Sequence, residues 1–242
     1  MARLALAAPA IVVAVLAVCC GGGNPSSPSG PSATPTPSTP APTTVTLYPS
    51  VEEPASISSE YPHWADFVDP FPPHKYLDAG WNYWKRVEPP HDRSWSGFAA
   101  ALKFDLAPIA RRTVTKATLR LYVLHAKRDP KIAPPIKLNA LSTAWDPETI
   151  TWNVLAGIPF HTSGESRVPT PSTTGPLDWN VTDIVRNWAS GAWGNYGLRM
   201  SVDRYPDPGY ESWASISVCA TAGVGDILSP ECQRPVLIID CQ

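Results

Sequence analysis

The chain has 242 residues and a formal net charge of −2, with 21 acidic residues against 19 Lys and Arg. This length fits one large domain, and the near-neutral charge excludes a general basic field of the kind that draws proteins to nucleic acids or acidic membranes. No nucleic-acid partner is therefore expected, and an anionic partner must be met by a local group of cationic side chains.

The first segment is an apolar run over residues 4–18 that follows a single positive charge. It is shorter than the roughly 20 residues of a spanning helix and is typical of a secretory signal. Its end, the sequence LAVC at Cys19, resembles the lipobox of bacterial lipoproteins, whose cysteine is acylated. We expect a signal segment over residues 1–19, lipidation of Cys19 with Cys20 as the alternative, and an exported protein held by its lipid at a bacterial cell surface or outside the cell.

Residues 20–44 are dominated by Pro, Ser, Thr and Gly and contain almost no apolar side chains. Such a composition cannot bury a core, so the segment is expected to be a disordered linker. The folded domain is expected over residues 45–242.

Within that domain the apolar residues alternate with a period of two rather than 3.6. In the run from Ala117 to Leu124, for example, Leu119, Leu121 and Val123 share one face. Short runs of this kind, separated by Pro, Gly and Asp, predict an all-β sandwich or barrel of antiparallel strands. The expected strands are VTLYPSV, AALKFDL, ATLRLYVL, IKLNALS, TITWNVL, YGLRMSV, SWASISV and RPVLIID.

Residues 60–96 are rich in proline, which central strands do not tolerate. We expect a long insertion of loops containing one strand, YLDAGWNYWKR. The stretch Val181–Ser190 instead predicts the one helix of the domain. There Thr182 can cap, Asp183 suits the positive end of the helix dipole, and one stripe is apolar. The stripe consists of Ile184, Val185 and Trp188.

Three cysteines lie near the C-terminus, and an exported chain meets an oxidising compartment. The loop CATAGVGDILSPEC would be closed by a bridge, so a disulfide between Cys219 and Cys232 is predicted. No partner is assigned to Cys241.

The order of motifs resembles one family of exported modules. ALKFDLAPI, ATLRLYVL, WDPETITWN, WNVTDIVRNWASGAWGNYGLRMSV and RPVLIID together resemble the disaggregatase-related DNRLRE family over about residues 98–240. The resemblance implies an antiparallel jelly roll whose short helix caps one end of the sandwich. It also implies binding of a polysaccharide such as alginate. Asn180 departs from the family, which usually has Asp before Val-Thr.

The aromatic stretch Val181–Met200 is accordingly interpreted as scaffold rather than as an active site. Its glycines, Gly191, Gly194 and Gly197, are expected to provide the tight path from the helix back into a strand. Trp145 and Trp152 are expected to lie in the core or at its edge.

The sequence singles out no catalytic group, and none is expected. It contains no Gly-x-Ser-x-Gly elbow, its five histidines are scattered, and no pair of its 21 carboxylates stands out. The strand motifs Gln-x-His and Tyr-x-Lys-x-Gly-x-Tyr, known in jelly-roll polysaccharide lyases, are also missing from the sequence.

Sugar binding requires flat aromatic faces and a few donors for hydroxyls or carboxylates. The stretch GWNYWKR supplies both, and alternation places Trp81, Tyr83 and Lys85 on one face and Trp84 and Arg86 on the other. The predicted ligand-binding residues are Trp81, Tyr83, Trp84, Lys85, Arg86, Arg204 and Tyr205.

No cofactor is expected, although a structural calcium ion is conceivable. Glu52 and Glu53 on the first strand could approach Asp240 on the last one, but calcium prefers six to eight oxygen ligands. The leading interpretation is a monomeric, non-catalytic surface module that binds polysaccharide. A structural or adhesive domain that binds protein or cell wall is the second, and a polysaccharide-degrading enzyme is the third.

Overall fold

The computed structural model describes residues 41–49, 55–58, 76–85, 93–129, 131–132, 134–147, 149–203, 211–220 and 233–242. All of them lie in one compact unit, Thr39–Gln242. The expected signal segment and most of the linker lie outside the described residues. None of the helices in the described part is long and apolar enough to cross a membrane.

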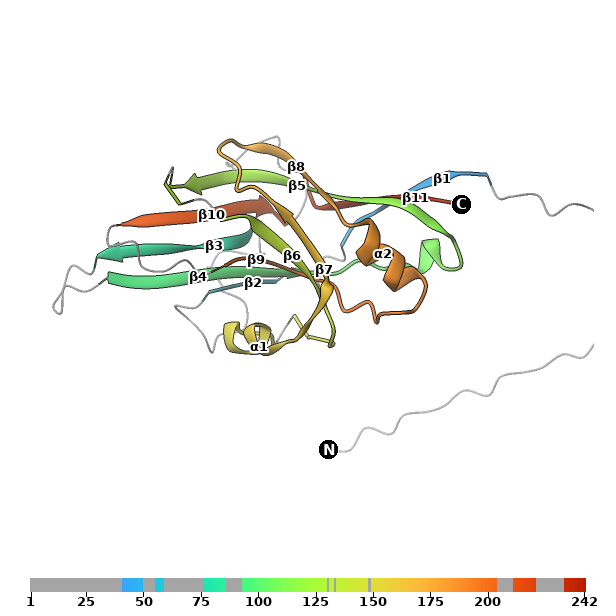
Figure 1. Ribbon diagram of the computed structural model, residues 1–242, viewed down its shortest axis with the longest axis horizontal. Helices are drawn as coiled ribbons and strands as arrows, with labels where there is room; N and C mark the ends of the chain where they lie inside the picture. Colours follow the sequence, from blue (N-terminus) through green and yellow to red (C-terminus); the bar gives the residue numbers. More distant parts are fainter. Residues whose placement is uncertain are drawn as a thin grey trace, which may run out of the picture. The chain divides into compact units, whose positions relative to one another are not determined.

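The fold is all-β, with every described pairing antiparallel, as the period-two pattern predicts. The strands form one curled sheet in the order β1-β11-β5-β10-β3-β4-β9-β6-β7, with β2 beside β4 and β8 beside β5 (Figure 1). Their bounds are β1 Thr43–Leu47, β2 Ala55–Ser58, β3 Tyr76–Lys85, β4 Arg93–Leu102, β5 Val114–Arg128, β6 Ile136–Leu141, β7 Phe160–Val168, β8 Gly175–Asn180, β9 Leu198–Val202, β10 Ser212–Cys219 and β11 Val236–Cys241.

The long strand β5 explains how the sheet curls. Its first half pairs with β11 and β8, and its second half pairs with β10. Leu119, Leu121 and Val123 all point into the main core, whereas Arg120 on the other face is exposed and forms an ion pair with Asp178 of β8. The alternation predicted for this strand is confirmed.

The predicted helix is α2, Thr182–Ala189, and it lies at the end of the sheet where β5 begins (Figure 1). Ile184, Val185 and Trp188 are buried in the main core together with Trp179 of β8. The helix therefore closes the core at this end, and the stretch that contains it is scaffold. Thr182 does not cap the helix, because the cap position is Val181.

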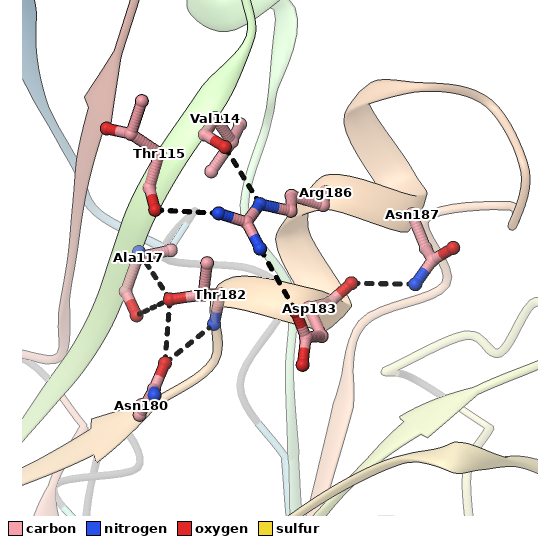
Figure 2. A network of polar contacts seen from close by, with 8 residues as sticks. All are labelled: Val114, Thr115, Ala117, Asn180, Thr182, Asp183, Arg186 and Asn187. Atoms are coloured by element: carbon pink, nitrogen blue, oxygen red, sulfur yellow. Dashed lines mark hydrogen bonds and ion pairs between the residues drawn. The ribbon is translucent and has the colours of Figure 1, made fainter.

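Arg186 links α2 to the first two residues of β5 by hydrogen bonds (Figure 2). Its Nε donates to the carbonyl of Val114 (2.9 Å), and one terminal nitrogen donates to the carbonyl of Thr115 (2.9 Å). The other terminal nitrogen lies 3.3 Å from a carboxylate oxygen of Asp183 one helical turn earlier. The planar guanidinium fork thus satisfies two backbone acceptors that β5 leaves outside its ladder.

Asn180 and Thr182 form the second part of this junction (Figure 2). The Thr182 hydroxyl accepts from the backbone N–H of Ala117 (3.0 Å) and donates to Asn180 Oδ1 (2.7 Å), which also accepts from the Thr182 N–H (3.1 Å). The contact needs only a side-chain oxygen at position 180. The departure of Asn180 from the family's usual Asp therefore preserves the junction.

One expectation about elements was wrong. TITWNVL is not a strand: Thr151 caps a second helix, α1 Trp152–Gly157, by accepting from the N–H of Val154 (3.2 Å). Within the expected insertion over residues 60–96, the predicted strand YLDAGWNYWKR is present as β3, a central strand between β10 and β4, and β4 begins at Arg93. The other residues of the insertion lie outside the described part. The sequence signal for α1 was Thr151, a residue type that often caps a helix three residues before the N–H it binds. The β-branched residues beside it favour a strand and obscured this signal.

The return from α2 to β9 depends on glycine at two described positions. Gly191 and Gly197 have φ of 76° and 87°, a region that other residues rarely adopt. At Gly197 an added Cβ would also lie 2.6 Å from the carbonyl oxygen of Leu102. The tight path predicted between helix and strand is therefore present.

The two ends of the domain lie side by side. β1 pairs with β11 in the register Thr43 to Cys241, and the C-terminus lies beside the start of β1 (Figure 1). Cys241 is buried and free, with its sulfur 3.5 Å from the carbonyl oxygen of Thr43. Cys219 ends β10 in the core and Cys232 lies outside the described residues, so their disulfide stays a prediction.

Candidate functional site

Charged and amide side chains gather on the outer side of three neighbouring strands, which we call the β6–β9 face. It consists of Lys137 and Asn139 on β6, Glu165 and Arg167 on β7, Arg199 and Ser201 on β9, and Asp203 directly after β9. The ladder register places Asn139 between Glu165 and Arg199, and Lys137 between Arg167 and Ser201. Alternation puts the intervening residues of β6 and β9 in the main core, so these polar groups point away from it.

Glu165 is the centre of this network. It accepts a hydrogen bond from Asn139 Nδ2 (3.0 Å), forms an ion pair with Arg167, and lies 3.9 Å from Lys137 Nζ. Burial alone would raise the pKa of Glu165. The hydrogen bonds from Asn139 and Arg167 and the charges of Lys137 and Arg167 outweigh burial and hold that pKa below its usual range. Glu165 is therefore a fixed carboxylate at neutral pH.

Lys137 is held in the same way, by Asp203 and Glu165. Each of four charged groups thus has an opposite charge beside it within the described residues: Lys137, Asp203, Glu165 and Arg167. Such pairs hold one another's side chains in place, and exposed pairs contribute little net stability.

Arg199 differs from the other charges of this face. Its guanidinium lies 4.8 Å above the ring of Phe160, and a terminal nitrogen donates to the carbonyl of Leu155 in α1 (3.4 Å). Its Nε is buried and has no hydrogen-bond partner among the described residues. Burial lowers the pKa of Arg199, which the charges of Asp203 and Glu165 only partly oppose.

The position of Arg199 follows from two elements that cover the rest of this face. α1 and the loop before it pack on Ala99, Ala101 and Leu141 and form a small core there. Arg199 lies at the border of that core, with Phe160 exposed beside it. A partly desolvated guanidinium whose charge is only partly balanced by its neighbours is suited to bind a carboxylate or a set of hydroxyls through its terminal nitrogens.

The sequence-predicted ligand residues are placed differently. Trp81 and Tyr83 are 0% and 4% exposed, and they pack with Ile132 and Ala214. An aromatic ring must expose a face to stack on a sugar, so the expectation for these two residues is corrected: they are core. Trp84 and Lys85 belong to β3, but their side chains lie outside the described part, as do Arg86, Arg204 and Tyr205.

The described part does not test the expected calcium site, because it includes only Asp240 of the three expected ligands. β1 does pair with the last strand, but the residue opposite Asp240 is Thr44, whose hydroxyl donates to that carboxylate (2.7 Å). Glu52 and Glu53 lie outside the described residues. Among the described residues no three His, Cys, Asp or Glu side chains are grouped so as to hold a metal.

Sequence reasoning missed Arg199, Phe160 and the exposed Trp213 of β10. Arg199 stood as a lone cation between Leu198 and Met200 in an alternating run, and this pattern predicts only that it faces away from the core. That Arg199 lies opposite Asn139, which in turn lies opposite Glu165, depends on the order of the strands, and the pattern does not contain that order. Phe160 begins β7, a strand that we did not predict.

Comparison with known proteins gives one family match. The model of carbohydrate-binding module family 96 matches residues 91–212, which is 122 of the 242 residues and thus half of the chain. The match runs from the start of β4 through β9 and includes the whole β6–β9 face. The expected kinship to carbohydrate-binding modules is confirmed, while the DNRLRE name stays a prediction.

Two curated relatives share a similar stretch. The tRNA nuclease WapA of Bacillus subtilis (strain 168) is 29% identical over 135 residues, and the tRNA3(Ser)-specific nuclease WapA of Bacillus spizizenii is 29% identical over 127 residues. Each match covers 52% of this chain but only 5% of the relative. The chain therefore spans about a twentieth of the relatives it matches.

Proposed function

Because this chain belongs to carbohydrate-binding module family 96, we propose that it is a non-catalytic module that binds an acidic polysaccharide through the β6–β9 face. The observation that supports this proposal is Arg199, with its buried Nε without a partner in the described part and its pKa lowered by burial. A ligand carboxylate beside Arg199 would supply the opposite charge that its surroundings supply only in part. Alginate, whose rings all carry carboxylates, is the polymer to test first.

The composition of the face supports an acidic ligand. It has three cationic groups, Lys137, Arg167 and Arg199, against two carboxylates, Glu165 and Asp203. The two carboxylates hold Lys137 and Arg167 in place, which leaves Arg199 as the charge available to a ligand. Ser201 adds a hydroxyl that can bind sugar hydroxyls, whereas Asn139 is only 1% exposed and serves to hold Glu165.

The decisive experiment measures alginate binding by the full chain, in wild type, Arg199→Ala and Arg199→Lys. We expect at least about a tenfold loss of affinity in Arg199→Ala and partial retention in Arg199→Lys, which keeps the charge but not the fork. Affinity for alginate should also fall with added salt, because exposed charges are screened over about 8 Å at physiological ionic strength.

Arg120→Ala is the matched control. It removes a guanidinium of the same charge from another part of the sheet, where Arg120 is paired with Asp178. Equal losses in Arg120→Ala and Arg199→Ala would reduce the effect to net charge and would remove the β6–β9 face from consideration. The sequence-predicted residues Arg204 and Tyr205, which follow Asp203 in the chain, can be tested in the same assay with Arg204→Ala and Tyr205→Ala.

The two alternatives keep their own tests. A structural or adhesive domain would leave a glycan array blank, including its acidic glycans. A degrading enzyme would release new reducing ends from alginate, and this release would depend on a carboxylate or histidine of the chain. The tRNA nuclease activity named for the WapA proteins is not carried over, since the shared stretch is 5% of those proteins.

We also propose that the module is displayed at a bacterial surface, with Cys19 lipidated and residues 20–42, which precede β1, acting as spacer. A spacer of this length in the polyproline II conformation would reach roughly 70 Å at about 3.1 Å per residue. We likewise propose a calcium site near Asp240 and a disulfide between Cys219 and Cys232.

A further inference from the structure

A second surface of the domain, separate from the β6–β9 face, presents an exposed tryptophan among small polar side chains. We call it the β10 face. It consists of Trp213, Ser215 and Ser217 on β10, Asp78, Gly80 and Asn82 on β3, and His125 and Lys127 on β5. The family match ends at residue 212, so Trp213 and all of β3 lie outside it.

The ladder registers place these residues in rows across three adjacent strands. Trp213 lies opposite Asn82. Ser215 lies between Gly80 and Lys127, and Ser217 lies between Asp78 and His125. The residues between them on β10, Ala214, Ile216 and Val218, are buried, so the rows face away from the core.

Trp213 is distinctive among the exposed aromatic side chains of the described residues. Those side chains are Tyr48, Phe160 and Trp213, each 39–44% exposed. The ring of Tyr48 is covered by the Arg234 guanidinium at 3.5 Å, and that of Phe160 by Arg199 at 4.8 Å. Trp213 has no such ring or cation contact within the described part, so its indole face is available.

The rows beside Trp213 leave room for an extended ligand along β10. At Gly80 an added Cβ would lie 2.3 Å from the carbonyl oxygen of Ala214, so β3 approaches β10 closely and no side chain fits there. Ser215 and Ser217 are short, and from Trp213 to Ser217 the strand extends about 13 Å at roughly 3.3 Å per residue. An indole at one end of a low, hydroxyl-bearing strip matches a chain of pyranose rings, whose apolar faces stack and whose hydroxyls hydrogen-bond.

The charge of the strip favours a neutral chain. Lys127 is its exposed amine, but Asp78 lies on the same side with its carboxylate bonded to the Ser217 hydroxyl. Glu211, just before β10, is exposed as well, and His125 is the remaining titratable group on the strip. Acidic and basic groups thus balance here, unlike on the β6–β9 face.

We propose that the β10 face is a second glycan-binding site, in which Trp213 stacks on a pyranose ring of a neutral polysaccharide and Asn82, Ser215 and Lys127 bind its hydroxyls. The site is independent of Arg199. It goes beyond the proposed binding of acidic polysaccharide, because it takes a different polymer on different strands of the sheet.

The test measures binding of the full chain to two neutral polymers, hydroxyethylcellulose and glucomannan, and to alginate. The variants are Trp213→Ala, Trp213→Tyr and Arg199→Ala, and each is first compared with wild type in thermal unfolding. We expect Trp213→Ala to weaken binding to at least one neutral polymer by about tenfold or more, which corresponds to about 1.4 kcal/mol. Trp213→Tyr should recover part of it, and Arg199→Ala should leave it unchanged.

Three results would overturn this second site, the first two of which concern the neutral polymers alone. One is neutral-polymer binding by Trp213→Ala equal to that of wild type, and another is no binding of either neutral polymer by wild type. The third is a folded Trp213→Ala that loses alginate and neutral polymers equally, which would mean a single shared site. Failure of the acidic site appears separately, as an Arg199→Ala variant that binds alginate normally.

Discussion

At the scale of single residues, burial separates three tryptophans of the described part, which are structural, from a fourth that is exposed. Trp179, Trp188 and Trp81 are at most 6% exposed, whereas Trp213 is 42% exposed. A buried indole contributes a large apolar area to the core, and its removal leaves a cavity. Replacing tryptophan by alanine should therefore lower the stability of the fold strongly at a buried position and very little at an exposed one.

Trp188→Ala is expected to lower the free energy of unfolding by about 3–5 kcal/mol, the usual cost of truncating a buried aromatic residue. Urea unfolding followed by circular dichroism measures it. Trp213→Ala serves as the matched control and should shift stability by only about 0.5 kcal/mol, as exposed substitutions do. A Trp188→Ala protein as stable as wild type would mean that α2 does not close the core.

Asp78 makes a prediction about pH. Burial is the main influence on its carboxyl and raises its pKa, against smaller lowering effects from Ser217 and the His125 charge. A carboxyl whose pKa is higher in the folded state disfavours folding once it ionises, so stability should fall as pH rises through the folded pKa. Asp78→Asn should therefore be more stable than wild type at neutral pH, and the difference should shrink as pH falls toward 4. Equal stability of the two proteins at both pH values would contradict this.

Strand alternation predicts from the sequence which residues share a face of a strand, but it does not predict which face is buried. The pattern of GWNYWKR correctly separates Trp81 and Tyr83 from the other side of β3, but it does not say which side is the core. That choice depends on the neighbours across the ladder. Ala214 and Ile216 of β10 lie on the same side as Trp81, and both are buried. Alternation predicts which residues of a strand share a face, and the order of strands in the sheet decides which of the two faces is buried.

At the scale of elements, α2 shows how a short helix is fixed to a sheet. Eight residues are too few for a stable isolated helix, so α2 depends on its tertiary contacts. Those contacts are the apolar stripe beneath it and the polar junction with β5 drawn in Figure 2. The helix could be predicted from its stripe, whereas the junction could not, because its acceptors are backbone carbonyls some 70 positions earlier in the chain.

Arg186→Ala should destabilise the domain by about 1–3 kcal/mol, because two hydrogen bonds from a charged donor are lost and the carbonyls of Val114 and Thr115 remain. Arg186→Lys should recover only part of this, since an ammonium cannot span both carbonyls as the fork does. Chemical denaturation measures both variants. Identical midpoints for Arg186→Ala and wild type would show that the apolar stripe alone holds α2.

β8 and α1 show why other elements were missed. β8, GPLDWN, contains a proline and alternates weakly, yet it pairs with β5 at an edge, where a missing N–H is tolerated. In α1 the residues suit a strand by propensity, and the Thr151 cap together with the packing of Leu155 decides for helix. In both elements tertiary context overrides local preference.

At the scale of the molecule, two glycan-binding faces on one domain would change how it holds polysaccharide. When a polysaccharide has bound to one face, the second face is held close to it. The effective concentration for the second binding step is then set by the fixed distance between the two faces. In a mixture of alginate and a neutral polymer, wild type should link the two into one co-sedimenting complex. Neither Arg199→Ala nor Trp213→Ala should do so, and co-sedimentation by both variants would contradict bivalency.

The proposed anchor is also a property of the whole chain. The full chain should partition into the detergent phase, and Cys19→Ser with Cys20→Ser should move it to the aqueous phase, because an acyl chain supplies most of its membrane affinity. Cys241→Ser is the control, since that thiol is buried in the domain. Equal aqueous partitioning of all three proteins would remove the lipid anchor from the proposal.

The pairing of β1 with β11 has a consequence for the order in which the domain can form. Chains are synthesised from the N-terminus, and the ladder partner of β1 is the last strand, which also fills the place between β1 and β5. β1 therefore has no described strand to pair with until β11 has been made, and such non-local pairing forms slowly. The sheet can be completed at this edge only after β11 has been synthesised, and a version without β11 would leave β1 and β5 without their shared neighbour.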